Sequence, residues 1–167
     1  VLRLVGSEMC IRDRFDSIHG KWQANIEKNK DEIKIDGKSI KATFVENIND
    51  LSLDNVDIMI DCTGVYKSSS KLQKYFDKGV KKVIVSAPIN EDNIVNIAYG
   101  VNHNIYKPIE HNIITGASCT TNCIAPIIKV LHENIGISHG SITTIHNSTN
   151  SQTLVDIPHN DLRRGRS

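Results

Sequence analysis

The stretch VDIMIDCTGVYKSSSKLQKYFDKGVKKVIVSAP, residues 56–88, carries the pattern that determines the fold class. It begins with one short apolar run at 56–60 and ends with another at 82–86, and the polar segment between them has Leu72, Tyr75 and Phe76 at helical spacing. Apolar runs without alternation are typical of parallel strands buried on both faces. Because the connection of about 20 residues is long enough for a right-handed crossover, the stretch predicts a βαβ unit and an α/β fold.

The segment before this stretch has a different pattern. After a polar region at 15–30, which predicts a loop with one short extended piece, apolar residues alternate with polar ones on both sides of Asp36-Gly37. Period-two alternation around an Asp-Gly pair predicts a β-hairpin over residues 33–44.

The segments after residue 88 predict further strands and one long helix. The apolar runs at 93–101 and 112–118 predict two additional strands. Residues 119–136, CTTNCIAPIIKVLHENIG, carry an apolar stripe that ends at Gly136, which predicts a helix. The segment 140–150, GSITTIHNSTN, predicts a strand that places His146 at its end.

Composition excludes several classes of protein. The chain has 167 residues with 20 Lys and Arg against 19 Asp and Glu, so a net charge of +1 implies no basic face for nucleic acid. Hydrophobic residues at 39% and charged residues at 23% are ordinary for a globular protein that buries a core. Four cysteines form no disulfide framework, and no apolar run reaches the roughly 18 residues of a membrane span. These features predict a cytoplasmic protein with neither membrane nor nucleic-acid partners.

The segment Ser118-Cys119-Thr120-Thr121-Asn122-Cys123 places a thiol where a predicted strand ends and a helix begins. Free backbone N–H groups and the positive end of the helix dipole favour a thiolate there and lower a cysteine pKa from its usual value of about 8.5. A nucleophilic cysteine also requires a base, and His146 is the candidate.

Two alternatives compete with a nucleophilic Cys119. One is a buried, inert cysteine that packs as a small hydrophobe, which is our expectation for Cys62 and Cys123. The other is a zinc site of Cys119, Cys123 and His146, but this set lacks a fourth ligand, so no metal is predicted.

Hydroxyl groups also cluster near the predicted strand ends. Ser118, Thr120, Thr149 and the Thr63-Gly64 turn supply uncharged donors of the kind that hold phosphate or ribose oxygens in α/β sheets. Taken singly, each of these residues is more often a turn or capping residue.

The segments ASCTTNC at 117–123 and TTIH at 143–146 resemble the glyceraldehyde-3-phosphate dehydrogenase family. Further segments agree in order, namely FDSIHGKW at 15–22, DCTGVY at 61–66, KKVIVSAP at 81–88, YGVNH at 99–103 and PHNDLRRGRS at 158–167. The resemblance implies a partial Rossmann-like dinucleotide-binding domain over 15–117 that lacks its first βα unit. The start of an α+β catalytic domain follows over 118–167.

The resemblance also implies a reaction and roles for the site residues. Cys119 would attack the aldehyde of glyceraldehyde 3-phosphate or a similar sugar phosphate, with His146 assisting proton transfer. Hydride would pass to NAD, with NADP not excluded, and inorganic phosphate would cleave the thioester. By family position, Ser118 and Thr120 flank the nucleophile.

The remaining implied roles concern phosphate and cofactor. Thr149 resembles the residue that binds the substrate phosphate. Thr63 and Gly64 resemble the turn that borders the dinucleotide, and Ser86 the serine near the nicotinamide ribose. A homotetramer is implied for the complete protein.

Several segments narrow the resemblance within the family. FDSIHGKW, TIHNSTNSQ and PHNDLRR are most similar to the branch associated with arsenic resistance, in which arsenate replaces phosphate, and erythrose-4-phosphate dehydrogenase is a neighbouring branch. Residues 1–14, VLRLVGSEMCIRDR, stand where the family has its pyrophosphate-binding loop, and we expect an artefactual leader there. The chain is therefore expected to be a fragment with weak or no activity. A non-catalytic α/β binding module remains the alternative from another functional class.

Overall fold

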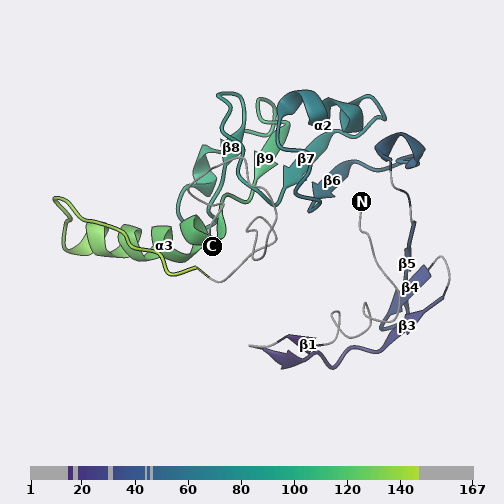
Figure 1. The fold of residues 1–167 in the computed structure, drawn as a ribbon, viewed down its shortest axis with the longest axis horizontal. Coiled ribbons are helices and arrows are strands. Elements are labelled where there is room, and N and C mark those ends of the chain that lie inside the picture. The colour runs from purple at the N-terminus through teal and green to yellow at the C-terminus, as the bar shows by residue number, and fades with distance from the viewer. Residues whose placement is uncertain (1–14, 17–18, 30–31, 44, 46, 147–167) are drawn as a thin grey trace, which may run out of the picture. The chain divides into compact units, whose positions relative to one another are not determined.

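The computed structural model describes residues 15–16, 19–29, 32–43, 45 and 47–146 (Figure 1). The expected leader at 1–14, Thr149 and the segment 158–167 lie outside these residues. The chain divides into two compact units, residues 1–130 and 131–167, and each is described by itself. The elements are β1 Phe15–Asp16, β2 Gly20–Lys21, β3 Ile26–Lys28, β4 Glu32–Ile35, β5 Lys38–Lys41, η1 Ile48–Asp50, β6 Ile58–Asp61, α2 Ser69–Phe76, β7 Lys82–Val85, β8 Val95–Asn96, η2 His103–Ile105, β9 Ile113–Thr115 and α3 Cys119–Asn134.

The predicted hairpin is confirmed. β4 and β5 pair antiparallel, with Ile33 opposite Ile40, and β3 adds a third strand. Asp36 and Gly37 both have positive φ, +48° and +79°, as a two-residue turn between right-twisted strands requires. Upstream, β1 and β2 form a separate antiparallel pair, so the segment at 15–30 holds three short strands where we predicted one extended piece.

A parallel four-stranded sheet forms the centre of the first unit. Its strand order is β6-β7-β9-β8, and every neighbouring pair is parallel. α2 connects β6 to β7 and packs against β7 (Figure 1). These elements confirm the predicted βαβ unit, the two additional strands and the α/β class, and they are consistent with a partial Rossmann domain.

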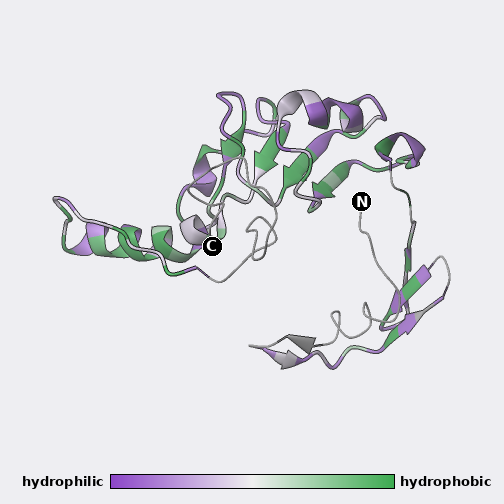
Figure 2. Cartoon of the chain, in the orientation of Figure 1, coloured by the Kyte–Doolittle hydropathy of each residue, from purple (hydrophilic) through white to green (hydrophobic). Residues whose placement is uncertain are grey.

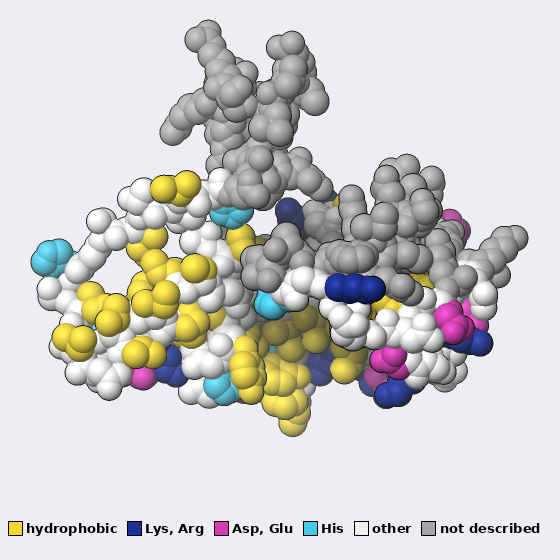
Figure 3. Space-filling view, turned by 90° about the horizontal axis from the view of Figure 1, so that it is seen from below, with side chains coloured by type: hydrophobic (Ala, Val, Ile, Leu, Met, Phe, Trp, Pro, Cys, Tyr) yellow, Lys and Arg dark blue, Asp and Glu magenta, His cyan; other side chains and the backbone are white. Residues whose placement is uncertain are grey.

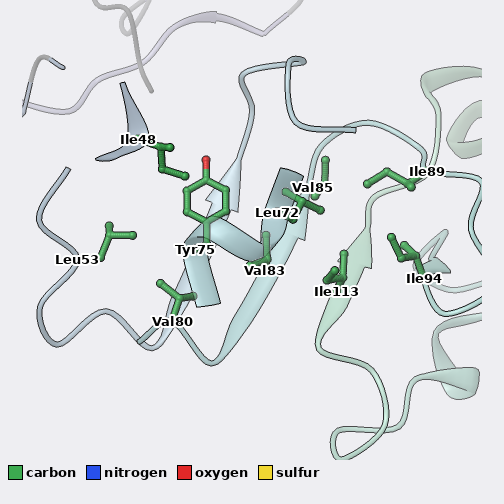
Figure 4. Close-up of a cluster of buried hydrophobic side chains, with 10 residues drawn as sticks. All are labelled: Ile48, Leu53, Leu72, Tyr75, Val80, Val83, Val85, Ile89, Ile94 and Ile113. Carbon is green, nitrogen blue, oxygen red and sulfur yellow. The ribbon is translucent and has the colours of Figure 1, made fainter. Parts of the chain in front are cut away.

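The core of the first unit lies between this sheet, α2 and η1. Leu72 and Tyr75 of α2 are buried with Val83 and Val85 of β7, as their helical spacing and the apolar run predicted. Figure 2 shows the apolar residues concentrated along the strands of the sheet. The complete cluster, labelled in Figure 4, is Ile48, Leu53, Leu72, Tyr75, Val80, Val83, Val85, Ile89, Ile94 and Ile113.

The prediction that both faces of every parallel strand are buried is wrong for β6. Ile58 and Ile60 remain 55% and 63% exposed, whereas Asp61, on the opposite face, is buried. β6 is an edge strand, and α2 covers only the face that carries Asp61. Cys62 has the same parity as Ile58 and Ile60, and it is exposed, which corrects the expectation of a buried, inert thiol.

The predicted helix after residue 118 is confirmed as α3. It ends near Gly136, whose N–H donates to the carbonyls of Leu131 and His132 with φ at +84°. None of its residues is buried, and apolar side chains are exposed along it (Figure 3). Cys123 is accordingly exposed, contrary to our expectation of burial.

The predicted strand ending at His146 is not formed. Residues 141–146 have no regular structure and are exposed. A strand requires a hydrogen-bonded neighbour, and none of the described strands pairs with this segment.

Candidate active site

Three parallel strands end at the same edge of the sheet, and the loops after them carry most of the predicted site residues. The N–H of Ser86, after β7, donates to the carbonyl of Asp61 at 2.9 Å, and the N–H of Gly116, after β9, donates to the carbonyl of Val85 at 2.9 Å. Ligands of open α/β sheets bind outside this carboxyl edge. The structure places Thr63, Gly64, Ser86 and Ser118 in these loops, and Cys119 and Thr120 in the first turn of α3, which follows the last of them.

Cys119 is the exposed first residue of α3, and Ser118 caps the helix. The Ser118 hydroxyl accepts a hydrogen bond from the Thr121 N–H at 3.0 Å. The Asn122 side-chain amide donates to the carbonyls of Gly116 and Ser118 at 2.7 and 2.9 Å. These two hydrogen bonds join the segment before the helix to the first turn of α3. The N-terminus of a 16-residue helix favours a negative charge at Cys119.

The turn between β9 and α3 has an unusual backbone. Ala117 is nearly buried and has φ of +56°, a left-handed conformation that costs a non-glycine residue about 1–2 kcal/mol. Its N–H donates to the Thr115 hydroxyl at 3.1 Å. Strained backbone of this kind tends to cluster at functional sites.

A buried carboxylate shapes the turn after β6. Asp61 is only 2% exposed, and one of its oxygens accepts from the N–H and the hydroxyl of Thr63 at 2.8 and 2.7 Å. The other accepts from the Tyr75 hydroxyl at 3.0 Å. The Thr63 hydroxyl in turn accepts from the Val65 N–H at 3.1 Å, so Thr63 and Gly64 are held in one conformation.

Comparison with known proteins gives matches over most of the chain. The NAD binding domain of glyceraldehyde 3-phosphate dehydrogenase matches residues 7–69, and the C-terminal domain of the same enzyme matches residues 118–167. Glyceraldehyde-3-phosphate dehydrogenase 3 of Nostoc is 46% identical over 156 residues, which are 92% of this chain. The chain belongs to the glyceraldehyde-3-phosphate dehydrogenase family.

Other members of the glyceraldehyde-3-phosphate dehydrogenase family match this chain over the same extent. Glyceraldehyde-3-phosphate dehydrogenase 2 of Streptomyces avermitilis is 45% identical and glyceraldehyde-3-phosphate dehydrogenase 1 of Bacillus cereus 40% identical, each over 92% of this chain. The chain spans 46% of the length of each of these curated relatives.

Two further residues with family-implied roles are not among the described residues of the first unit. His146 is an exposed residue of the second unit, and Thr149 lies outside the described residues. Within the part of the chain that the structure describes, no three His, Cys, Asp or Glu side chains gather closely enough to hold a metal ion.

Sequence analysis missed Asp61, Asn96 and Thr115, which shape the two turns at this edge. The Asp61-x-Thr63 spacing is a recognisable signal, because Asp side chains often accept from the backbone two residues later. No local signal marks Thr115 or Asn96, since their hydrogen bond joins residues 19 positions apart.

The Tyr75–Asp61 contact predicts that the folded protein loses stability at alkaline pH. Burial, and next the nearby Asp61 carboxylate, raises the pKa of Tyr75 well above the ordinary tyrosine value of about 10. Below about pH 10 the Tyr75 hydroxyl is protonated in both the folded and the unfolded chain. Above it the unfolded chain loses a proton that the folded chain keeps, so stability falls as pH rises. Urea midpoints at about pH 9 and about pH 11 should drop more in the wild type than in Tyr75→Phe. Parallel drops would contradict this prediction.

Proposed function

We propose that this protein is an NAD-dependent oxidoreductase that oxidises glyceraldehyde 3-phosphate through a thioester on Cys119. The observation that carries the proposal is the position of Cys119, exposed at the start of α3 on the carboxyl edge of a parallel sheet. Its relatives are glyceraldehyde-3-phosphate dehydrogenases, which supports this reaction and the three-carbon substrate over the four-carbon one.

The sheet edge fits a dinucleotide. A Cβ placed on Gly64 would meet no atom within 4 Å, so space is open beside this turn, and Gly64 itself has φ of +69°. Ser86 is exposed at the end of the neighbouring strand β7. The family match to an NAD binding domain supports NAD at this edge, with Thr63, Gly64 and Ser86 bordering it. When bound, NAD would supply the hydride acceptor.

The reaction at Cys119 follows from an activated thiolate. Its sulfur would add to the aldehyde carbon, and the carbonyl oxygen would take up the proton that His146 had received from the thiol, which gives a hemithioacetal. His146 would then accept the hydroxyl proton again as hydride leaves the same carbon, with bound NAD as its acceptor, and a thioester would remain on Cys119. Inorganic phosphate, or arsenate in its place, then attacks the carbonyl carbon, breaks the carbon–sulfur bond and releases the thiolate.

Finer features belong to the same proposal. Ser118 and Thr120 would line the substrate region and Thr149 would bind the substrate phosphate, in a catalytic domain that starts at residue 118, where the family's C-terminal domain begins to match. The complete protein would be a cytoplasmic homotetramer. No helix in the described ranges is long and apolar enough to cross a membrane.

Site-resolved alkylation of the chain tests the proposal. Iodoacetamide is added over a range of pH, and peptide mass spectrometry follows Cys119, Cys123 and Cys62 separately. Because all three are exposed, access does not distinguish them. Cys119 should react well below pH 8, at neutral pH about tenfold faster than Cys123. Equal rates at all three thiols would contradict a nucleophilic Cys119.

A further inference from the structure

A chain of hydrogen bonds leads from the backbone of Ile89 to the turn before Cys119. The Asn96 amide accepts from the N–H of Ile89 at 3.1 Å and donates to the carbonyl of Ile89 at 2.8 Å. The same amide oxygen accepts from the Thr115 hydroxyl at 2.6 Å, and that hydroxyl accepts from the N–H of Ala117 at 3.1 Å.

Each hydrogen bond in this series from Ile89 to Ala117 has a fixed direction. Because the two contacts to Ile89 orient the Asn96 amide, its oxygen and not its NH₂ faces Thr115. An amide oxygen only accepts, so the Thr115 hydroxyl must donate to it and offer a lone pair to Ala117. Thr115 is fully buried, so no solvent replaces either partner.

The hydrogen-bond series ends at Ala117, whose left-handed backbone conformation needs support. Ala117 has a left-handed backbone, and its neighbours are already fixed, because Gly116 donates to Val85 and Ser118 caps α3. If Ala117 relaxed to an ordinary φ, the Gly116 carbonyl would turn away from the Asn122 amide, which now donates to both Gly116 and Ser118. The first turn of α3 would lose this tie and fray, and Cys119 would leave the end of the helix dipole.

We propose that Thr115 and Asn96 are positioning residues for the nucleophile: they hold Ala117 in its left-handed conformation and thereby keep Cys119 at the N-terminus of α3. The inference rests on the proposed function, in which Cys119 reacts as a thiolate. It gives Thr115 and Asn96, which no local sequence pattern marks, a role in the reactivity of Cys119.

Thr115→Val tests the proposal, because valine keeps the shape of the side chain and removes the hydroxyl. The readout is the alkylation rate of Cys119 relative to Cys123 in the same chain, measured against pH, with circular dichroism to confirm folding. We expect this ratio to fall about tenfold at neutral pH, because Cys119 would lose the stabilisation that the helix N-terminus gives to its thiolate. Thr115→Ser, which keeps the hydroxyl, should retain most of the ratio.

A second substitution separates positioning from general destabilisation. Glycine adopts positive φ without strain, so Ala117→Gly in the Thr115→Val background should restore the Cys119 to Cys123 ratio. A loss that glycine does not relieve would contradict the proposed route through Ala117. If Thr115→Val does not fold, Asn96→Ala replaces it, with an expected loss of about threefold because Thr115 still offers its lone pair to Ala117.

The outcomes distinguish this inference from the proposed function. If Cys119 of the wild type reacts no faster than Cys123, the nucleophile assignment is wrong and the inference fails with it. If Cys119 reacts faster but Thr115→Val leaves the ratio unchanged, the proposed function stands and the positioning role is wrong.

Discussion

Replacing Cys119 with serine is expected to abolish covalent acylation of the chain. An activated ester such as 4-nitrophenyl acetate acylates a thiolate directly: the sulfur–carbon bond forms, the ester carbon–oxygen bond breaks and 4-nitrophenolate leaves. At neutral pH a serine hydroxyl has no comparable anion, so the initial burst should fall by a factor on the order of 10³. The burst amplitude and the mass of the acetylated peptide measure it.

Cys123→Ser is the matched control for this substitution. Cys123 lies on the same helix, is also exposed and differs from Cys119 chiefly in its distance from the helix N-terminus. It should leave the burst nearly unchanged, because the dipole effect declines within the first turn. Acetylation that persists in Cys119→Ser and maps to Cys123 would identify Cys123, and not Cys119, as the nucleophile and would refute the proposal.

Local patterns were sufficient to predict the elements that present Cys119. The runs that became β6 and β7, and the helical spacing of Leu72 and Tyr75, each depend on residues close in sequence. The Asp36-Gly37 turn and the start of α3 are likewise local, because two or three residues determine the backbone there. For this reason the fold class and the place of Cys119 at the start of α3 were predictable.

Features that depend on distant partners were not predictable. The burial of Asp61 depends on Tyr75, and the conformation of Ala117 depends on the side chain of Thr115, which is itself held by Asn96. The exposed face of β6 shows the same limitation, because an apolar run does not reveal whether another element covers it. The segment before His146 was predicted as a strand, but it pairs with none of the described strands.

Asp61→Ala is expected to give the largest loss of stability at the site. Asp61 is 2% exposed and accepts three hydrogen bonds, so its removal leaves the buried Tyr75 hydroxyl and the Thr63 N–H and hydroxyl without their acceptor. Hydrogen bonds to a charged acceptor contribute about 1.5–3 kcal/mol each and are not additive, so we expect a loss of about 2–4 kcal/mol. Urea unfolding followed by circular dichroism measures it.

Asp57 provides the matched control, since it precedes the same strand and is also a partner in a charged contact. Its carboxylate lies 2.7 Å from the Lys81 ammonium, but both side chains are largely exposed. Water replaces an exposed ion pair at little cost, so Asp57→Ala should leave the urea midpoint almost unchanged. Asp61→Asn should be intermediate, because its single oxygen can accept from Thr63 or from Tyr75 but its NH₂ cannot accept from the other. Equal losses for Asp57→Ala and Asp61→Ala would show that burial of the Asp61 carboxylate is not what stabilises the Thr63-Gly64 turn.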